Sequence, residues 1–225
     1  MRRTLAKASF HTALNLLFFA LIGTAILALT HSQTFDRIAQ SEEAAKLKLI
    51  GQILPPALFD NDIIKNTISI APDALLGTDS STTAYLARLK DQPSALVLEA
   101  IAPDGYSGKI TLLVAIKENG EIAGVRVIAH KETPGLGDYI EIAKSKWIKV
   151  FDGTSQVRYN DSDWKVKKDG GQFDYMSGAT ITPRAIVKAV HKALQYFTLH
   201  HDALFAATTI PNPAPPPLNQ PEKKT

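Results

Sequence analysis

The N-terminal part of the chain contains an apolar run, from Ala13 to Thr30, that no charged side chain interrupts. A helix of this length rises about 27 Å, close to the hydrocarbon thickness of a bilayer. Arg2, Arg3 and Lys7 precede the run without a neighbouring acid. Because such basic residues are retained in the cytoplasm, the pattern predicts a transmembrane helix over 13–30, with residues 1–12 cytoplasmic and the remainder outside.

Two other interpretations of this run stay open. A cleaved signal peptide has the same order of basic and apolar residues, although its apolar region is usually shorter. No clean small-x-small cleavage pattern stands near Ala28 to Ser32. A buried core helix is less favoured, because the apolarity is uninterrupted. An anchor and a signal peptide would both place the following domain outside the cytoplasm.

The next segment, 31–56, has apolar residues at helical spacing among charged ones. Within it, Phe35 to Leu54 reads as an amphipathic helix whose stripe includes Leu47 and Ile50. Pro55-Pro56 ends the pattern, since proline cannot continue a helix. Residues 31–56 are therefore predicted to be an amphipathic helix and linker.

A two-residue period of apolar positions begins at Thr83 and predicts strands. The strands cover 83–89, 95–101, 109–117 and 122–129. Asn119-Gly120 joins the last two, and its tolerance of positive φ predicts a type I′ turn. Leu113 lies opposite the apolar positions of its own strand, which suggests partial cover on the second face of the sheet. The mixed, turn-rich pattern of residues 57–82 predicts no definite element.

Glycines and a proline between Lys131 and Asp138 predict a loop after the last strand. Packing residues over 139–150 predict a helix, and the polar stretch 161–172 predicts another loop. A clear helix is expected from Thr182, a good N-cap that Pro183 follows at the first helical position.

The chain as a whole is predicted to be of the α+β class. After the single N-terminal transmembrane helix comes one extracytoplasmic domain over 57–207, with a mainly antiparallel sheet and flanking helices. Residues 208–225 contain a run of prolines and a polar end, which are typical of a disordered tail.

Composition and charge narrow the function further. The net charge is only +3, and Lys and Arg are scattered rather than clustered, so no nucleic-acid partner is expected. The chain has no cysteine, which removes disulfides, cysteine-bound metal clusters and thiol nucleophiles. No catalytic or metal-binding set of residues is predicted.

The most promising chemistry lies in the segment from Asp174 to Thr180, immediately before the last helix. Ser177 and Thr180 flank Gly178-Ala179, whose small side chains would let a ligand approach the backbone. The start of the following helix would favour a phosphate there. On spacing alone an ordinary turn is the better interpretation, and Gly-x-Ser-x-Gly is absent, which argues against a serine nucleophile.

The same segment resembles the flavinylation motif Asp-x-x-(Ser/Thr)-Gly-Ala-Thr of FMN-binding domains in Rnf-type electron transport complexes, and the chain as a whole resembles their G subunits. The resemblance covers roughly residues 1 to 200 and includes several ordered motifs. They are 102–108 (Ala-Pro-Asp-Gly-Tyr-Ser-Gly), 130–138 (His-Lys-Glu-Thr-Pro-Gly-Leu-Gly-Asp), 167–171 (Lys-Lys-Asp-Gly-Gly) and 177–185 (Ser-Gly-Ala-Thr-Ile-Thr-Pro-Arg-Ala).

The resemblance implies covalent FMN, attached through its phosphate as an ester to Thr180. It also implies that a separate flavin transferase, which uses FAD and a divalent metal, forms the bond and recognises Asp174. Ser177, Gly178 and Ala179 would then adjoin the cofactor. The loop residues Thr133, Gly135, Leu136 and Gly137 would close on the isoalloxazine ring or ribityl chain.

Other matched residues have less definite roles. His130 and Glu132 could tune the flavin by charge or hydrogen bonding, or could be structural. Tyr106 and Trp164 could stack on it, although packing is the better interpretation. Lys167-Lys168 reads as a solvated pair.

The function implied is that of an electron carrier in a bacterial inner-membrane complex that couples electron transfer to ion movement, with its domain in the periplasm. In that family the whole complex exchanges electrons between ferredoxin and NAD, or reduces a redox-sensing regulator. Its partners would be the other subunits, the membrane and the flavin transferase. Three alternatives remain: the FMN-carrying C subunit of a sodium-pumping quinone reductase, a cofactor-free membrane-anchored sensor or scaffold, and a flavin enzyme acting on a small molecule.

Overall fold

The computed structural model describes residues 2–206, without the side chains of residues 2–8, 36, 39, 40 and 43. Its elements fall into two units, 1–46 and 47–225. The predicted disordered tail, 208–225, lies outside the described residues.

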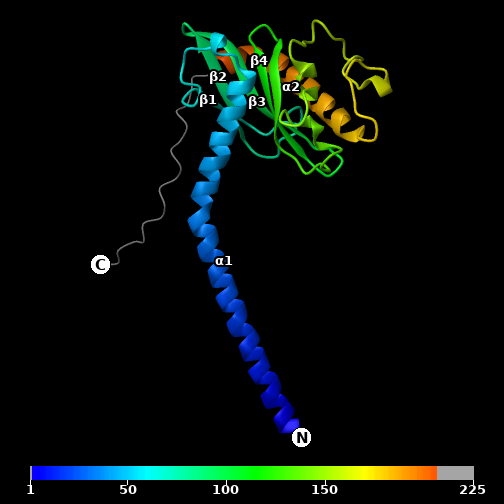
Figure 1. Cartoon of the computed structure of the whole chain (residues 1–225). Coiled ribbons are helices and arrows are strands. Elements are labelled where there is room, and N and C mark those ends of the chain that lie inside the picture. The colour runs from blue at the N-terminus through cyan, green and yellow to red at the C-terminus, as the bar shows by residue number, and fades with distance from the viewer. Residues whose placement is uncertain (1, 207–225) are drawn as a thin grey trace, which may run out of the picture. The chain divides into compact units, whose positions relative to one another are not determined.

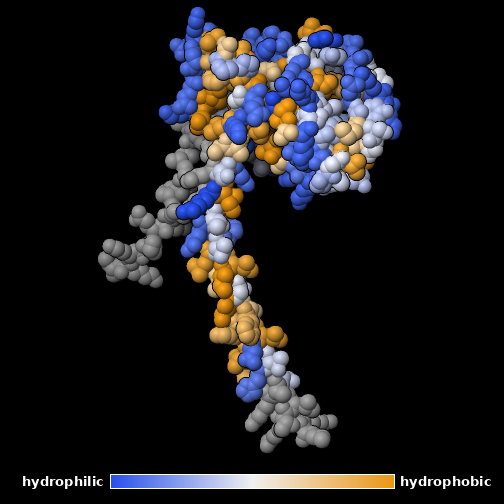
Figure 2. All heavy atoms as spheres, viewed as in Figure 1, coloured by the Kyte–Doolittle hydropathy of each residue, from blue (hydrophilic) through white to orange (hydrophobic). Residues whose placement is uncertain are grey.

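The N-terminal unit belongs to one long helix, α1 (Arg2–Ile53), so the two helices predicted over 13–30 and 35–54 are continuous. The part from Ser9 to Phe35 has a mean hydropathy of 2.2 and none of it is buried within the protein. Figure 2 shows apolar side chains over this part of the helix. By length and composition it is a candidate membrane span. The helix ends before Pro55-Pro56, as expected.

The second unit is built on five antiparallel strands in the order β1-β2-β3-β4-β5. They are β1 (Thr67–Ile70), β2 (Thr82–Leu89), β3 (Gln92–Ala102), β4 (Ile110–Lys117) and β5 (Ile122–Ala129). The four predicted strands are confirmed, and β1 lies in the stretch that had no definite assignment. The α+β class is therefore confirmed.

The turns of the sheet differ from the prediction. Asn119 does not adopt positive φ, so the expected type I′ turn is wrong. Instead Gly120 alone is left-handed, at φ 82°, and its N–H donates to the carbonyl of Lys117 at 2.9 Å in a longer loop. Lys90 and Asp91, in the turn between β2 and β3, also adopt positive φ. This conformation was not predicted from the sequence.

Both faces of the sheet are covered. Helix α2 (Ile181–Ala206) packs on one face through side chains such as Ile186 and Val190. The last turn of α1 packs on the other, where Ile53 meets Leu113 and its neighbours. Gly124 permits this approach, because a Cβ there would lie 2.9 Å from the Ile53 side chain.

The connection from β5 to α2 also differs from the prediction. Residues 139–150 form no α-helix but contain two short 3₁₀ helices, η2 (Asp138–Ile140) and η3 (Trp147–Phe151). Their aromatic residues pack edge to face: Tyr139 on Trp147, and Trp147 on Phe151. The remaining short 3₁₀ helices are η1 (Pro56–Leu58) and η4 (Lys167–Asp169), the latter within the predicted loop 161–172. Tertiary packing of aromatic residues, rather than helical periodicity, organises this connection.

Candidate functional site

The loop that follows β5 is a closed turn. The carbonyl of Thr133 accepts hydrogen bonds from the N–H groups of Leu136, at 3.1 Å, and Gly137, at 2.9 Å. Gly135 adopts φ 78°, a conformation that side chains with a Cβ rarely adopt, and its N–H donates to Asp138 Oδ1 at 2.8 Å. The glycine-containing loop predicted from the sequence is therefore present, and hydrogen bonds fix its conformation.

Glu132 ties this loop to two other parts of the chain. Its Oε1 accepts from the Ser107 N–H at 3.0 Å, and its Oε2 accepts a hydrogen bond from the Thr182 hydroxyl. Only 4% of Glu132 is exposed. Gly137 packs directly on it, because a Cβ on Gly137 would lie 2.9 Å from Glu132 Cβ. The β3–β4 connection, the β5 loop and the start of α2 thus meet at one carboxylate.

A network of charges supports the loop from behind. Lys144 Nζ lies 2.6 Å from Asp138 Oδ2 and 3.0 Å from Glu141 Oε1, and His130 Nε2 lies 2.8 Å from the same Glu141 oxygen. The hydrogen bond from Lys144, and then that from the Gly135 N–H, lower the pKa of Asp138. The hydrogen bond with His130 is the main cause that lowers the pKa of Glu141.

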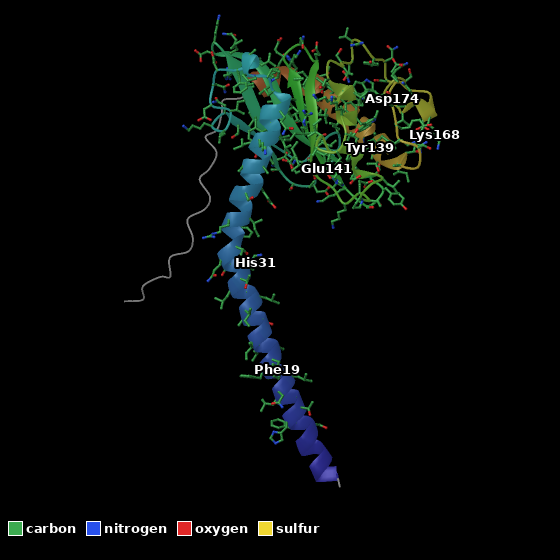
Figure 3. The ribbon with its side chains drawn as sticks, in the orientation of Figure 1. Phe19, His31, Tyr139, Glu141, Lys168 and Asp174 are labelled. Carbon is green, nitrogen blue, oxygen red and sulfur yellow. The ribbon has the colours of Figure 1, made fainter. Side chains whose placement is uncertain are left out.

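The segment before α2 is held by the aromatic residues of the connection. Trp147 Nε1 donates to the Asp174 carbonyl at 2.8 Å, and the Met176 N–H donates to the Tyr139 hydroxyl at 3.4 Å. Burial raises the pKa of Tyr139 to about 12. Tyr139, Glu141 and Asp174 all come from the stretch between β5 and α2 (Figure 3). This packing gives the segment a fixed path up to the helix.

Thr180, rather than Thr182, is the N-cap of α2. Its carbonyl accepts from the Arg184 N–H at 3.4 Å, the first bond of the helical pattern. The predicted N-cap, Thr182, is instead buried in the first turn and bound to Glu132, and Pro183 stands third in the helix. The expectation failed because Thr182 is used for a tertiary contact. Thr180 therefore occupies the capping position, next to the first turn of the helix.

One cavity of about 280 Å³ lies between the β5 loop and the start of α2. Six predicted site residues line it: Thr133, Leu136, Gly137, Gly178, Ala179 and Thr180. Ser177, Gly135 and Asp174 do not line it. The remaining lining residues are Tyr106, Glu132, Ile181 and Thr182, for which the sequence offered either an uncertain role or none. The cavity brings together segments that are far apart in the chain.

The lining suits a phosphorylated, partly aromatic ligand. Gly178, at φ 87°, and Ala179 leave room beside the Thr180 hydroxyl, while Leu136 and Tyr106 are 49% and 67% exposed and available for apolar contact. The helix N-terminus next to Thr180 favours an anion. These features fit a flavin nucleotide such as FMN.

Other candidates are less suitable. Trp164 does not face this cavity: it is 4% exposed and stacks on His191 at 5.1 Å, which confirms packing as its role. An open groove of about 610 Å³ lies near Tyr159 and Gln195 and contains none of the predicted site residues.

Comparison with known proteins agrees with this site. Residues 105–195 match the family described as FMN-binding domain, and residues 1–53 match the family described as RnfG N-terminal region. The FMN-binding match contains both walls of the cavity.

Similar proteins are named as the G subunit of an ion-translocating oxidoreductase complex. The protein of Pseudomonas aeruginosa is 48% identical over 200 residues, which are 89% of this chain and 94% of that protein. The protein of Vibrio cholerae is 46% identical over the same shares. That of Shewanella oneidensis is 44% identical over 193 residues, which are 86% of this chain and 91% of that protein.

Proposed function

The chain belongs to the family of G subunits of ion-translocating oxidoreductase complexes, and we propose that it carries FMN esterified through its phosphate to Thr180. As a member of the family it is a subunit of a redox-driven ion translocase and has an FMN-binding domain. The covalent link and its position are the proposal. The single observation that carries it is the place of Thr180, at once the N-cap of α2 and a lining residue of the cavity.

The N-cap position explains why this hydroxyl would suit a phosphoester. The first N–H groups of a helix have no partner within it, and they point toward the capping side chain. A phosphate on Thr180 would accept hydrogen bonds from the backbone N–H groups of Ile181 and Thr182, whereas Pro183 has no backbone N–H. The helix dipole adds a favourable interaction with the remaining negative charge. No lysine is needed to hold the phosphate.

Asp174 would contribute to recognition by the transferase rather than hold the cofactor. Its side chain is 65% exposed, pairs with Lys167 at 2.6 Å and is absent from the cavity lining. Ser177 and Gly178 are also exposed, so the segment from Asp174 to Thr180 is accessible to a second protein. A flavin transferase that approaches here would join the Thr180 oxygen to the FMN phosphorus of FAD. The pyrophosphate bond of FAD would break, AMP would leave, and the threonine proton would pass to the transferase.

The loop from Thr133 to Gly137 would form the opposite wall of the flavin site. Leu136 offers an apolar surface, and Gly137 allows the loop to pack against Glu132. Gly135 acts indirectly by permitting the turn. These residues would orient the cofactor and exclude water, while the bound flavin supplies electron transfer. In this role the chain is an electron carrier within the complex.

The domain boundaries and topology are part of the same proposal. Residues 13–30 would cross the bacterial inner membrane, 1–12 would be cytoplasmic, 31–56 would link the membrane to the domain, and 57–207 would form the periplasmic FMN-binding domain. The candidate span and the basic residues before it support this orientation. Its partners would be the membrane, the other subunits and the transferase, with no nucleic acid. A tethered flavin could not be lost to the periplasm.

The test of the cofactor is the intact mass of the full chain produced with and without a flavin transferase. We expect an FMN-sized increment only with the transferase, and peptide mapping should place it on Thr180. An unmodified Thr180 in the native complex would contradict the proposal and favour a cofactor-free scaffold. Turnover of a small molecule by the isolated chain would favour the flavin-enzyme alternative.

The orientation can be tested with single cysteines, because the chain contains none. Val157 is 95% exposed, so Val157→Cys should react with a membrane-impermeant maleimide in spheroplasts. Thr4→Cys is the matched control and should react only after the membrane is opened. The reverse pattern would overturn the topology.

A further inference from the structure

Glu132 stands out among the acidic residues around the cavity because it is both buried and part of the lining. It is 4% exposed, and its two oxygens accept from the Ser107 N–H and the Thr182 hydroxyl. Both donors are neutral groups, a backbone N–H and a hydroxyl. The cavity wall therefore contains a buried carboxyl group.

The other acids near the site each form an ion pair with a lysine. Asp138 pairs with Lys144, Glu141 with Lys144 and His130, and Asp174 with Lys167. Within the part of the chain that the structure describes, no Lys, Arg or His nitrogen forms such a pair with Glu132. A charge on this carboxyl group would therefore have no cation beside it among the described residues.

His130 is adjacent in space but cannot neutralise Glu132 in this arrangement. Its Nδ1 accepts a hydrogen bond from the Glu132 backbone N–H at 3.0 Å, so that nitrogen bears no proton. Its Nε2 faces Glu141 at 2.8 Å. The imidazole thus fixes the backbone of Glu132 while directing its own proton away from the Glu132 carboxylate.

The start of α2 explains how such a charge is accommodated. Thr182 lies in the first turn, so the carboxylate that it binds lies at the positive end of the helix dipole. Hydrogen bonds from Ser107 and Thr182 would add to the stabilisation of an ionised Glu132. Both donors are neutral, so they would leave its net charge unchanged.

We propose that Glu132 is ionised and lowers the reduction potential of the flavin held in this cavity. Reduction adds electrons to the flavin, and a fixed negative charge nearby disfavours that addition. Glu132 lines this cavity of about 280 Å³, so a flavin bound there would lie near its carboxylate. The inference deepens the proposed function and rests on it, because it requires FMN in the cavity. Glu132 is a positioning residue whose charge acts through space.

The test is the flavin midpoint potential of the FMN-loaded full chain, measured by following visible absorbance during reductive titration. Glu132→Gln removes the charge, and its amide can still accept from Ser107 and donate to the Thr182 oxygen. We expect the ratio of reduced to oxidised flavin at a fixed potential to rise at least about tenfold, or about 30 mV for a two-electron couple. Glu132→Met is a second neutral variant and should shift the potential in the same direction.

Three control variants separate charge from packing. Glu132→Asp keeps the charge and should restore the potential toward that of the wild type. Thr182→Val removes the hydroxyl that binds Glu132 but keeps the charge of Glu132. If Glu132→Gln acted only through lost packing, Thr182→Val would shift the flavin potential by the same amount. Glu141→Gln removes an acid that is already paired, and should shift the potential less.

The possible failures are distinguishable. An FMN-loaded Glu132→Gln variant with an unchanged potential, or an equal shift in Thr182→Val, would overturn the role of Glu132 alone. If the wild-type chain gains no FMN under maturation conditions, the proposed function fails, and the role of Glu132 fails with it.

Discussion

The hydroxyl of Thr182, in the first turn of α2, donates a hydrogen bond to the carboxylate of Glu132, fifty positions earlier in the chain. This contact joins the two walls of the cavity that also contains Thr180. It connects the helix start that would hold the phosphate to the loop that would cover the ring. Changes on either side of this contact should therefore affect both folding and flavin chemistry.

The first prediction concerns the attachment oxygen. Thr180→Ala should abolish covalent FMN, because it removes the only oxygen of that side chain, and the flavin band in a denaturing gel should disappear. Ser162→Ala is the matched control: it also removes a hydroxyl from the connection between β5 and α2, but Ser162 is exposed and lies outside both the motif and the cavity lining. The control should retain most of its fluorescence. Persistent fluorescence in Thr180→Ala would place the bond elsewhere.

The second prediction concerns recognition by the transferase. Asp174→Asn should slow FMN incorporation about tenfold or more, as expected for the loss of one charge-assisted hydrogen bond to the transferase. Initial rates can be measured by the increase of flavin fluorescence on the chain.

Asp104→Asn is the control for Asp174→Asn. Asp104 pairs with Lys188 at 2.6 Å, as Asp174 does with Lys167, and its side chain is similarly exposed. Neither variant should change the melting temperature measurably, because exposed ion pairs contribute little to stability. Equal incorporation rates for the two variants would refute the role of Asp174.

The third prediction concerns close packing in the loop. Gly137→Ala places a Cβ 2.9 Å from Glu132 Cβ although the backbone, at φ −87°, accepts any residue. The overpacking should destabilise the domain by about 1–3 kcal/mol and displace Glu132. The melting temperature measured by thermal unfolding and the rate of FMN incorporation should both decrease.

A glycine remote from the cavity separates stability from site geometry. Gly120→Ala forces a Cβ onto a residue at φ 82° but meets no neighbouring atom. Its strain should cost about 1–2 kcal/mol without slowing FMN incorporation. If Gly137→Ala likewise leaves incorporation unchanged, the loop is not a wall of the flavin site.

The fourth prediction concerns stability and pH. Burial lowers the pKa of His191 from its ordinary value of 6.5, against the opposing effect of Asp161 at 3.0 Å. Below pH 6.5 the unfolded chain binds a proton that the folded chain resists, so this histidine makes stability fall as the pH decreases toward its folded-state pKa.

The variant His191→Gln isolates that effect. His201 has a raised pKa, chiefly from its hydrogen bond with Asp202, and contributes stability of the opposite pH dependence. The difference in unfolding free energy between wild type and His191→Gln, measured by denaturant titration from pH 8 to pH 5, should therefore shift in favour of the variant as pH decreases. A difference independent of pH would contradict the lowered pKa.

The sequence anticipated much of the sheet because strand patterns are local. Alternation around Leu112 and Val114 fixed the faces of β4, and Leu113 correctly indicated cover on the second face. The covering element itself, the last turn of α1, could not be inferred. Its contact with β5 depends on Gly124, 71 positions after Ile53 at the end of the helix, and hydrophobic periodicity does not predict contacts over such a separation.

The failures have a common cause. Residues 139–150 have enough packing residues for a helix, but Tyr139 and Trp147 pack against each other and hold the segment before α2 through hydrogen bonds. Thr182 has the side chain of an N-cap, yet a buried partner engages it. In both places a tertiary contact overrode a local preference.

The sequence by itself determined the candidate membrane span, the strands β2 to β5 and the small-residue segment that ends at Thr180, because each depends on neighbours along the chain. Only the tertiary structure decided that Thr180 caps α2 and that the loop from Thr133 to Gly137 lines the same cavity. It also decided that Glu132 lies between them with no cation paired to it among the described residues. The physical reason is that a cavity and its electrostatic field depend on side chains brought together from distant positions in the chain. Local sequence patterns do not show which distant positions come together.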